Sequence, residues 1–352
     1  MKVLLKIVLV LLMLAGLVYG WATYSMQQYL HTPLTLEKPM ALSVEAGDTL
    51  RSVTRKLRKS GVSTNTHWLL FRARLDETAS QIKAGDYTVE AGTTPAGLLE
   101  QLIKGDVDLE SVTFLEGWTS AQFVAAVMDH PAIKNDLPIK LGARANGEPW
   151  LDDANQTELA SLVGLKTSHT EGRFAPDTLR FAAGTKASRL LQQSAALMQQ
   201  RLDRVWSDGQ PPTPIQSPDE LLTLASIIEK ESGVSDERAK IAGVFIRRLR
   251  KGMRLQTDPT VIYGIGAAYD GDIRRKDLSN KTDYNTYTID GLPPTPIAAP
   301  GLASIEAAMQ PADGTELYFV ASGLGDGGHV FSDTLAEHQT AVAAYLKRLR
   351  QR

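Results

Sequence analysis

The pattern of apolar and polar residues opens with an uncharged apolar run over residues 7–24. This run is close to the shortest length with which a helix crosses the apolar core of a bilayer. Lys2 and Lys6 precede it and no basic residue follows it closely, which places residues 1–6 in the cytoplasm. The alternative is a cleaved signal peptide, but the run lacks a convincing cleavage site and is longer than most signal-peptide cores. We therefore expect a single-pass anchor, with the rest of the chain outside the cytoplasmic membrane.

Residues 25–40 are polar and contain Pro33 and Pro39, which predicts a linker. Over residues 41–107, alternation and helical periodicity predict the order strand, helix, helix, strand, helix. Two similar segments, VEAGDTL and VEAGTTPAGLL, stand before the predicted helices. Such strand–turn–helix units resemble the LysM-like carbohydrate-binding modules of bacterial cell walls. A small structural α/β subdomain explains the same pattern equally well, because such turns are common.

Residues 108–352 mix strand-like and helix-like segments. The pattern predicts a strand at Ser111–Leu115 and helices at Ala121–Asp129 and Ala187–Trp206. The segments on both sides of Gly323–Gly328 read as strands, so its G-x-G-x-x-G spacing predicts a hairpin tip and not a dinucleotide site. We expect an α+β protein with a transmembrane helix, a LysM-like subdomain and a mixed α/β domain.

A proline-rich break precedes the most clearly delimited helix, Ser217–Ser232. Ser217 is placed as its N-cap, Pro218 occupies the first helical position, and Glu220 completes a capping box. A second helix is predicted from Asp236 to Lys251.

Glu229 and Glu231 lie at opposite margins of the apolar stripe of the first of these helices. The stripe consists of Leu221, Leu224, Ala225 and Ile228. Two carboxylates two residues apart lie far apart around a helix, so they cannot be the pair that flanks one glycosidic bond. If one is catalytic, the other is expected in a salt bridge or in solvent. The helical wheel does not choose between them.

Composition excludes several classes of protein. The 352 residues carry a formal charge of -2 and no basic cluster interleaved with aromatic residues, which argues against nucleic-acid binding. The chain has 0 cysteines, so thiol nucleophiles, zinc ribbons and disulfides are excluded. Its six histidines include no pair at the spacing of a helical metal site, and we expect no metal and no cofactor.

Four blocks of the sequence resemble the endolytic murein transglycosylase, or YceG-like, family. They are ASIIEKES (225–232), GVFIRRLRKGMRLQTDPTVIYGIG (243–266), YNTYTIDGLPPTPIAAPG (284–301) and the shorter EGRFAPDTLRF (171–181). The resemblance runs from the anchor to the C-terminus. It implies that residues 108–352 form a YceG-like catalytic domain on the periplasmic side of the inner membrane. It also implies that the second glutamate of the E-K-E triplet, Glu231, is catalytic.

The activity implied by this resemblance needs only one carboxyl group. A lytic transglycosylase cleaves the β-1,4 bond between N-acetylmuramic acid and N-acetylglucosamine by attack of the muramic acid C6 hydroxyl, which leaves a 1,6-anhydro end. Because the nucleophile belongs to the same sugar, its effective concentration is very high and no second carboxylate has to position water. The acid must start protonated, so partial burial is expected to raise its pKa.

The other blocks of the resemblance imply candidate substrate-binding residues, which offer amide, carboxyl and hydroxyl groups and aromatic rings. They are Gln256, Asp258, Tyr263, Asn285, Tyr287 and Glu171. Each also has an ordinary structural reading: Asp258 can cap a helix and Tyr263 can pack in the core. The block around Glu171 lacks the aromatic residue that the family often has after Pro-Asp-Thr, which leaves the role of Glu171 open.

The expected partners are peptidoglycan glycan strands, the inner membrane and peptidoglycan synthases. The expected role is to limit the length of nascent strands near the membrane. Two alternatives stay open. The first is a conventional glycoside hydrolase in which Asp258 or Glu171 activates water. The second is a non-enzymatic peptidoglycan-binding scaffold that recruits synthases through the LysM-like part.

Overall fold

The computed structural model describes residues 2–36, 38–45, 47–62, 66–106, 108–231 and 233–351. Val107, Ser232 and Arg352, which end a predicted subdomain, a predicted helix and the chain, lie outside the described residues. The chain forms two compact units. The first comprises Met1–Glu110 with Arg180–Gly184, and the second comprises Ser111–Leu179 with Thr185–Arg352.

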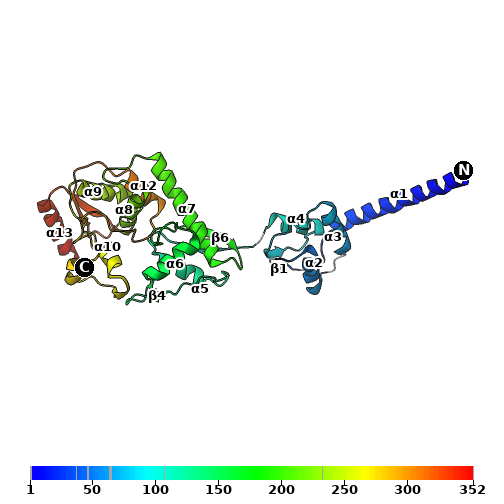
Figure 1. The fold of residues 1–352 in the computed structure, drawn as a ribbon, viewed down its shortest axis with the longest axis horizontal. Helices are drawn as coiled ribbons and strands as arrows, with labels where there is room; N and C mark the ends of the chain where they lie inside the picture. Colours follow the sequence, from blue (N-terminus) through cyan, green and yellow to red (C-terminus); the bar gives the residue numbers. More distant parts are fainter. Residues whose placement is uncertain are drawn as a thin grey trace. The chain divides into compact units, whose positions relative to one another are not determined.

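Among its described residues, two strands and four helices lie wholly within the first unit (Figure 1). They are α1 (Lys2–His31), β1 (Met40–Val44), α2 (Leu50–Lys59), α3 (Thr66–Leu75), β2 (Gly85–Val89) and α4 (Pro95–Lys104). After α1, the order strand, helix, helix, strand, helix matches the prediction. β1 and β2 are antiparallel, and Leu42 and Tyr87, which face each other in the ladder, are both buried. The likeness to LysM modules stays a prediction.

The predicted linker at residues 25–40 is wrong in its first part, because α1 continues through it to His31. Met26, Leu30 and Leu34 are buried in the core of the first unit, so this segment packs as part of a folded structure. The apolar part of α1 is exposed, and over Lys6–His31 the helix is long and apolar enough to cross a membrane by length and composition. In the sequence, Met26, Leu30 and Leu34 are spread over nine positions of a mostly polar segment. The two prolines therefore outweighed them, and the segment was predicted as a linker.

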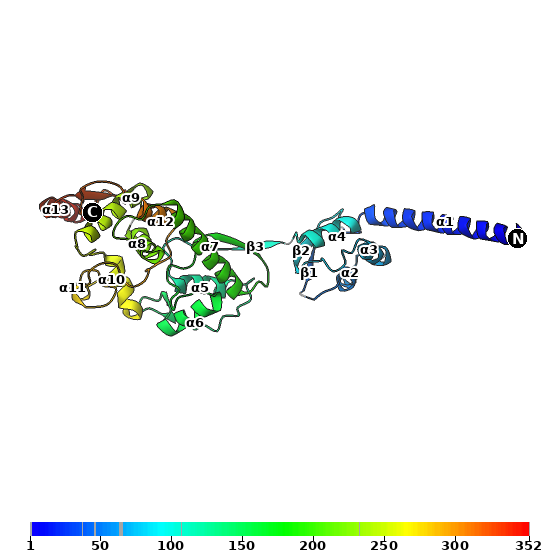
Figure 2. The same ribbon diagram turned by 45° about the horizontal axis from the view of Figure 1, so that its top comes forward.

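From residue 109 onward, helices predominate and strands form short pairs (Figure 2). The elements are β3 (Leu109–Thr113), α5 (Ser120–Asp129), β4 (Gly142–Ala143), β5 (Pro149–Trp150), α6 (Asp153–Val163), β6 (Thr178–Ala182), α7 (Ala187–Asp208), α8 (Pro218–Glu231), α9 (Arg238–Arg250), α10 (Asp258–Ile265), α11 (Arg275–Ser279), α12 (Leu302–Met309), β7 (Tyr318–Ala321), β8 (His329–Ser332) and α13 (Leu335–Leu349). β7 and β8 are antiparallel, which confirms the hairpin around Gly323–Gly328. The mixed α/β class is confirmed.

Helix α8 is the centre of the second unit. It packs against α7, α9, α10 and α12, and all of Leu221–Ile228 is buried. Burial therefore extends beyond the predicted stripe, since neighbouring helices cover more than one face. At its start the Ser217 hydroxyl accepts a hydrogen bond from the Glu220 amide at 3.2 Å, as the capping prediction required. The Glu220 carboxylate reaches one residue further back, to the amide of Gln216 at 2.7 Å. This burial fixes the helix and the direction in which its last turn faces.

Candidate active site

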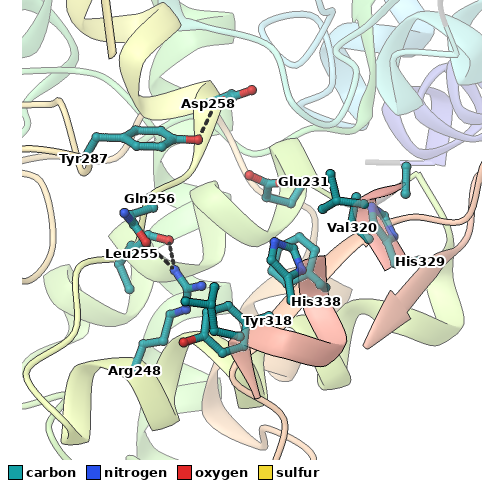
Figure 3. A pocket seen from close by; sticks show the side chains of 14 residues that line it. Glu231, Arg248, Leu255, Gln256, Asp258, Tyr287, Tyr318, Val320, His329 and His338 are labelled. Atoms are coloured by element: carbon teal, nitrogen blue, oxygen red, sulfur yellow. Dashed lines mark hydrogen bonds between the residues drawn. The ribbon is translucent and has the colours of Figure 1, made fainter. Parts of the chain in front are cut away.

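The last turn of α8 opens onto a pocket of about 500 Å³ in the second unit (Figure 3). That volume lies within the range of small-ligand and cofactor pockets. The lining residues come from the ends of α8 and α9, the start of α10, the β7–β8 hairpin and α13, with Leu255, Gln256 and Tyr287 from loops. They are Glu231, Arg248, Leu255, Gln256, Asp258, Tyr287, Tyr318, Phe319, Val320, Ala321, His329, Leu335, His338 and Val342. Three of the predicted binding residues therefore share a pocket with Glu231.

Glu231 is the last residue of α8, and its carboxyl group is half-buried between the Tyr287–Asp258 pair and the hairpin residue His329 (Figure 3). Burial raises the pKa of Glu231, because leaving water disfavours the charged form. The nearby Asp258 carboxylate raises it further, whereas a hydrogen bond from Thr257 and the proximity of His329 lower it. The net shift favours the protonated acid, as a proton donor requires.

Thr257 donates its hydroxyl hydrogen to Oε1 of Glu231. The backbone around it is held by Thr286, whose hydroxyl accepts from the Thr257 amide at 3.0 Å and whose carbonyl accepts from the Gln256 amide at 3.1 Å. Gln256 has φ of 52°, in the left-handed region that non-glycine residues seldom adopt. Backbone in this region costs energy and is found at functional sites, where surrounding contacts maintain it. Sequence reasoning selected both neighbours of Thr257 but missed Thr257 itself.

Asp258 and Tyr287 form the opposite wall of the pocket. The Tyr287 hydroxyl donates to Oδ1 of Asp258 at 2.7 Å, which orients both side chains. Burial raises the pKa of Tyr287, and the Asp258 carboxylate adds to that rise. Tyr287 therefore stays a neutral hydrogen-bonding ring. Helix α10 begins at Asp258 with Thr257 as its N-cap residue, so Asp258 is the first residue of the helix and does not cap it as predicted.

Glu229, two residues before Glu231, has a different role. Its Oε2 accepts hydrogen bonds from the Gly301 amide at 2.9 Å and the Ser304 hydroxyl at 2.8 Å, at the start of α12. Its Oε1 lies 3.6 Å from Arg238. A carboxylate at a helix N-terminus satisfies free amides and interacts favourably with the helix dipole. The salt bridge expected for one of the two glutamates is thus found at Glu229.

The structure does not bring Glu171, Tyr263 or Asn285 to the pocket lining. All three are buried. Glu171 accepts from the Ser120 amide at 2.9 Å, and burial raises its pKa to about 7. Its carboxyl group also forms a hydrogen bond with the Tyr263 hydroxyl.

Asn285 serves the loop that carries Tyr287. Its side-chain amide donates to the backbone carbonyls of Asp277, Leu278 and Asn280, at 3.1, 3.2 and 2.6 Å. Its Oδ1 accepts from the Tyr287 amide at 2.9 Å. The residue therefore orders backbone that supports the pocket wall.

Sequence reasoning missed five polar or aromatic residues of the lining, namely Arg248, Tyr318, Phe319, His329 and His338. His329 bonds Glu237 through Nδ1 at 2.7 Å and through its amide at 3.0 Å, so it is a hydrogen-bonded histidine as well as a lining residue. Their spacing in the sequence does not indicate that they lie near Glu231. Among the residues that the structure describes, no three His, Asp or Glu side chains gather as a metal site would require.

The chain belongs to the YceG-like family, whose sequence model matches residues 42–344. It is 29% identical over 311 residues to a Bacillus subtilis protein named endolytic murein transglycosylase, covering 87% of this chain and 84% of that relative. A protein of the same name from Streptococcus pneumoniae is 26% identical over 361 residues, covering 97% of this chain but 64% of the longer relative. The crystal structure of a YceG-like protein from Listeria monocytogenes superposes with a TM-score of 0.52 at 26% identity, covering 87% of this chain and 99% of that one.

Proposed function

We propose that this protein is an endolytic murein transglycosylase that cleaves the β-1,4 bond between N-acetylmuramic acid and N-acetylglucosamine in nascent peptidoglycan strands. The observation that carries the proposal is the setting of Glu231: a half-buried carboxyl group with a raised pKa, facing a pocket of ligand size. The names of the B. subtilis and S. pneumoniae relatives support the same activity.

The proposed reaction uses Glu231 twice. The protonated carboxyl group donates its proton to the glycosidic oxygen as the bond from that oxygen to C1 of muramic acid breaks. The C6 oxygen of the same sugar then forms a bond to C1, and its hydroxyl proton passes to the Glu231 carboxylate. The acid is regenerated, water is not consumed, and the product carries a 1,6-anhydro ring.

Gln256, Asp258 and Tyr287 are the proposed sugar contacts, because they line the same pocket as Glu231 and present amide, carboxylate and hydroxyl groups. For Glu171, Tyr263 and Asn285 the burial and the internal hydrogen bonds favour support of the surrounding backbone over contact with sugar.

The apolar part of α1 is the proposed inner-membrane anchor, with the catalytic unit on the periplasmic side. The length and hydropathy of the helix support the anchor, and the two lysines before it support the orientation. An anchored enzyme would meet strands as synthases extend them, which would limit strand length. The first unit, as a LysM-like module, would add contact with glycan.

Mass spectrometry of the ends produced from polymeric glycan tests this proposal, with Glu231→Gln as the inactive comparison. Ends with a 1,6-anhydro ring are expected. Asp258 supports one alternative, a conventional glycoside hydrolase, because a carboxylate in the same pocket as Glu231 could activate water. That hydrolase would release reducing ends that contain the added water. A purely binding scaffold would leave the polymer intact.

A further inference from the structure

Arg248 is a buried cation in the wall of the Glu231 pocket (Figure 3). Only 8% of the residue is exposed. Its Nε donates to the Leu317 carbonyl at 2.6 Å, and its Nη1 donates to the Leu255 carbonyl at 2.8 Å. These bonds fix the plane of the guanidinium group against the backbone of two segments that border the pocket.

The preceding residue, Arg247, shows how the same helix completes a structural arginine. Its Nε and Nη1 donate to the carbonyls of Glu316 and Ala312, at 2.7 and 3.0 Å. Its Nη2 then pairs with the Glu316 carboxylate at 2.9 Å. Arg248 has the same two kinds of backbone contact, but its Nη2 forms neither a hydrogen bond nor an ion pair with any residue in the described part of the chain.

A buried guanidinium group without a carboxylate is electrostatically incomplete, because charges that leave water are ordinarily paired. The aromatic neighbour Tyr318, whose ring lies 5.1 Å from the Arg248 guanidinium carbon, offers only a weak substitute. Burial lowers the pKa of Arg248 but leaves it charged at neutral pH, since a guanidinium group scarcely deprotonates in proteins. The one carboxylate on the far wall, Asp258, is already bonded to Tyr287.

We propose that Arg248 binds a carboxylate of the substrate, carried by the muramic acid sugar that enters the Glu231 pocket. This inference rests on the proposed function and specifies the part of the substrate that selects it. Muramic acid offers such a group in two ways. A peptide stem attached to its lactyl group bears carboxylates, and a stem-free sugar exposes the lactyl carboxylate itself. Both present the planar anion that the guanidinium fork fits best.

Matched substrates test the proposal in the wild-type, full-length protein. One pair consists of stem-bearing strands with free carboxylates and the same strands converted to primary amides. The other pair consists of stem-free strands with the lactyl carboxylate free or amidated. Amidation removes the charge but keeps a carbonyl oxygen. We expect kcat/KM to fall about tenfold to a hundredfold in the pair that contains the recognised carboxylate, as for the loss of a charged hydrogen bond.

Two neighbouring substitutions separate recognition from folding. Arg248→Met is expected to cleave free and amidated strands at rates within about twofold of each other, because the group that tells them apart is gone. Arg247→Met removes the structural arginine and should keep the wild-type preference. Arg248→Lys retains a positive charge and should keep part of the preference for strands with free carboxylates. If Arg248→Met does not fold, the wild-type substrate pairs still decide.

The two proposals fail in different ways. Equal rates for free and amidated strands in both wild-type pairs would overturn carboxylate binding by Arg248 while leaving the transglycosylase intact. Absence of cleavage in every substrate would overturn the proposed function itself. A fall in kcat/KM on amidation in only one substrate pair supports carboxylate binding by Arg248. The pair that shows it identifies the peptide stem or the lactyl group as the source of the carboxylate.

Discussion

Glu229 and Glu231 are two residues apart on α8, yet one carboxylate holds two helices together and the other faces the pocket. The 200° that separates them on an ideal helix, at roughly 100° per residue, is the reason. Glu229 meets the start of α12 and Arg238, whereas Glu231 meets Thr257 and open space. Replacement of Glu231 should therefore affect glycan cleavage, whereas replacement of Glu229 should affect the stability of the fold.

Replacing Glu231 with glutamine should abolish glycan cleavage without unfolding the protein. The amide cannot donate a proton to the leaving oxygen, and loss of a general acid lowers rates by roughly 10²–10⁴ or more. The free energy of unfolding should stay equal or rise at pH 8, because burial already penalises the charged carboxylate. Chromatography of digested strands and thermal unfolding measure the two effects. Full cleavage by this variant would remove Glu231 from the mechanism.

Replacing Glu229 with alanine should lower the free energy of unfolding by about 2–4 kcal/mol, because buried donors lose their acceptor. The Gly301 amide and the Ser304 hydroxyl lose a carboxylate, and the ion pair left to Arg238 among the described residues is with the half-exposed Glu116 at 3.8 Å. Below the unfolding temperature, cleavage should persist. Denaturant titration and product analysis on the same preparation test this. A stable but inactive variant would exchange the roles of Glu229 and Glu231.

The pH profile of cleavage should report the hydrogen bond from Thr257 to Glu231. That bond stabilises the carboxylate and lowers the pKa of Glu231, so its removal should raise this pKa. The proposed mechanism requires the protonated acid, so activity should be lost as pH rises through this pKa. In Thr257→Val the alkaline limb of kcat/KM should therefore move to higher pH, while Thr257→Ser, which keeps the hydroxyl, should hold it in place. A shift to lower pH would contradict the assignment.

Glu171 should make the second unit less stable as pH rises. Burial raises its pKa to about 7 from an ordinary value of 4.5, so the folded state binds the proton more tightly than the unfolded state. The resulting stability is fully present below pH 4.5 and is lost as pH rises to about 7, a total of about 3 kcal/mol. Glu171→Gln stays neutral and should lack this decline. Unfolding midpoints at pH 5 and pH 8 compare the two proteins, and parallel curves would refute the burial effect.

Local patterns predicted the local structure well. Helix α8 begins within one residue of its predicted start because the capping residues and Pro218 act on the first turn alone. The choice between Glu229 and Glu231 could not be made in this way, since it depends on α12 and the segment around Thr257. The family resemblance supplied Glu231 where helical geometry left both open.

The pocket itself was beyond reach of local patterns. His329 comes from a segment distant in sequence from Glu231 and Arg248 from the following helix, and the packing of α9 and the β7–β8 hairpin brings both to the same pocket. The role of Tyr263 as a sugar platform stays a prediction, although its ring is buried and outside the lining of the Glu231 pocket. The local sequence around this tyrosine does not show whether its ring faces solvent or, as in this structure, the buried Glu171.

Helix α1 passes from its apolar run into the core of the first unit without a break, and Met26 and Leu30 are buried there. With residues 7–24 in a bilayer, as proposed, no flexible linker separates the membrane-spanning part of the helix from the first unit. A thicker or thinner bilayer changes the tilt of a spanning helix. The first unit must tilt with it, so the lipid environment would steer the orientation of this unit over the membrane surface.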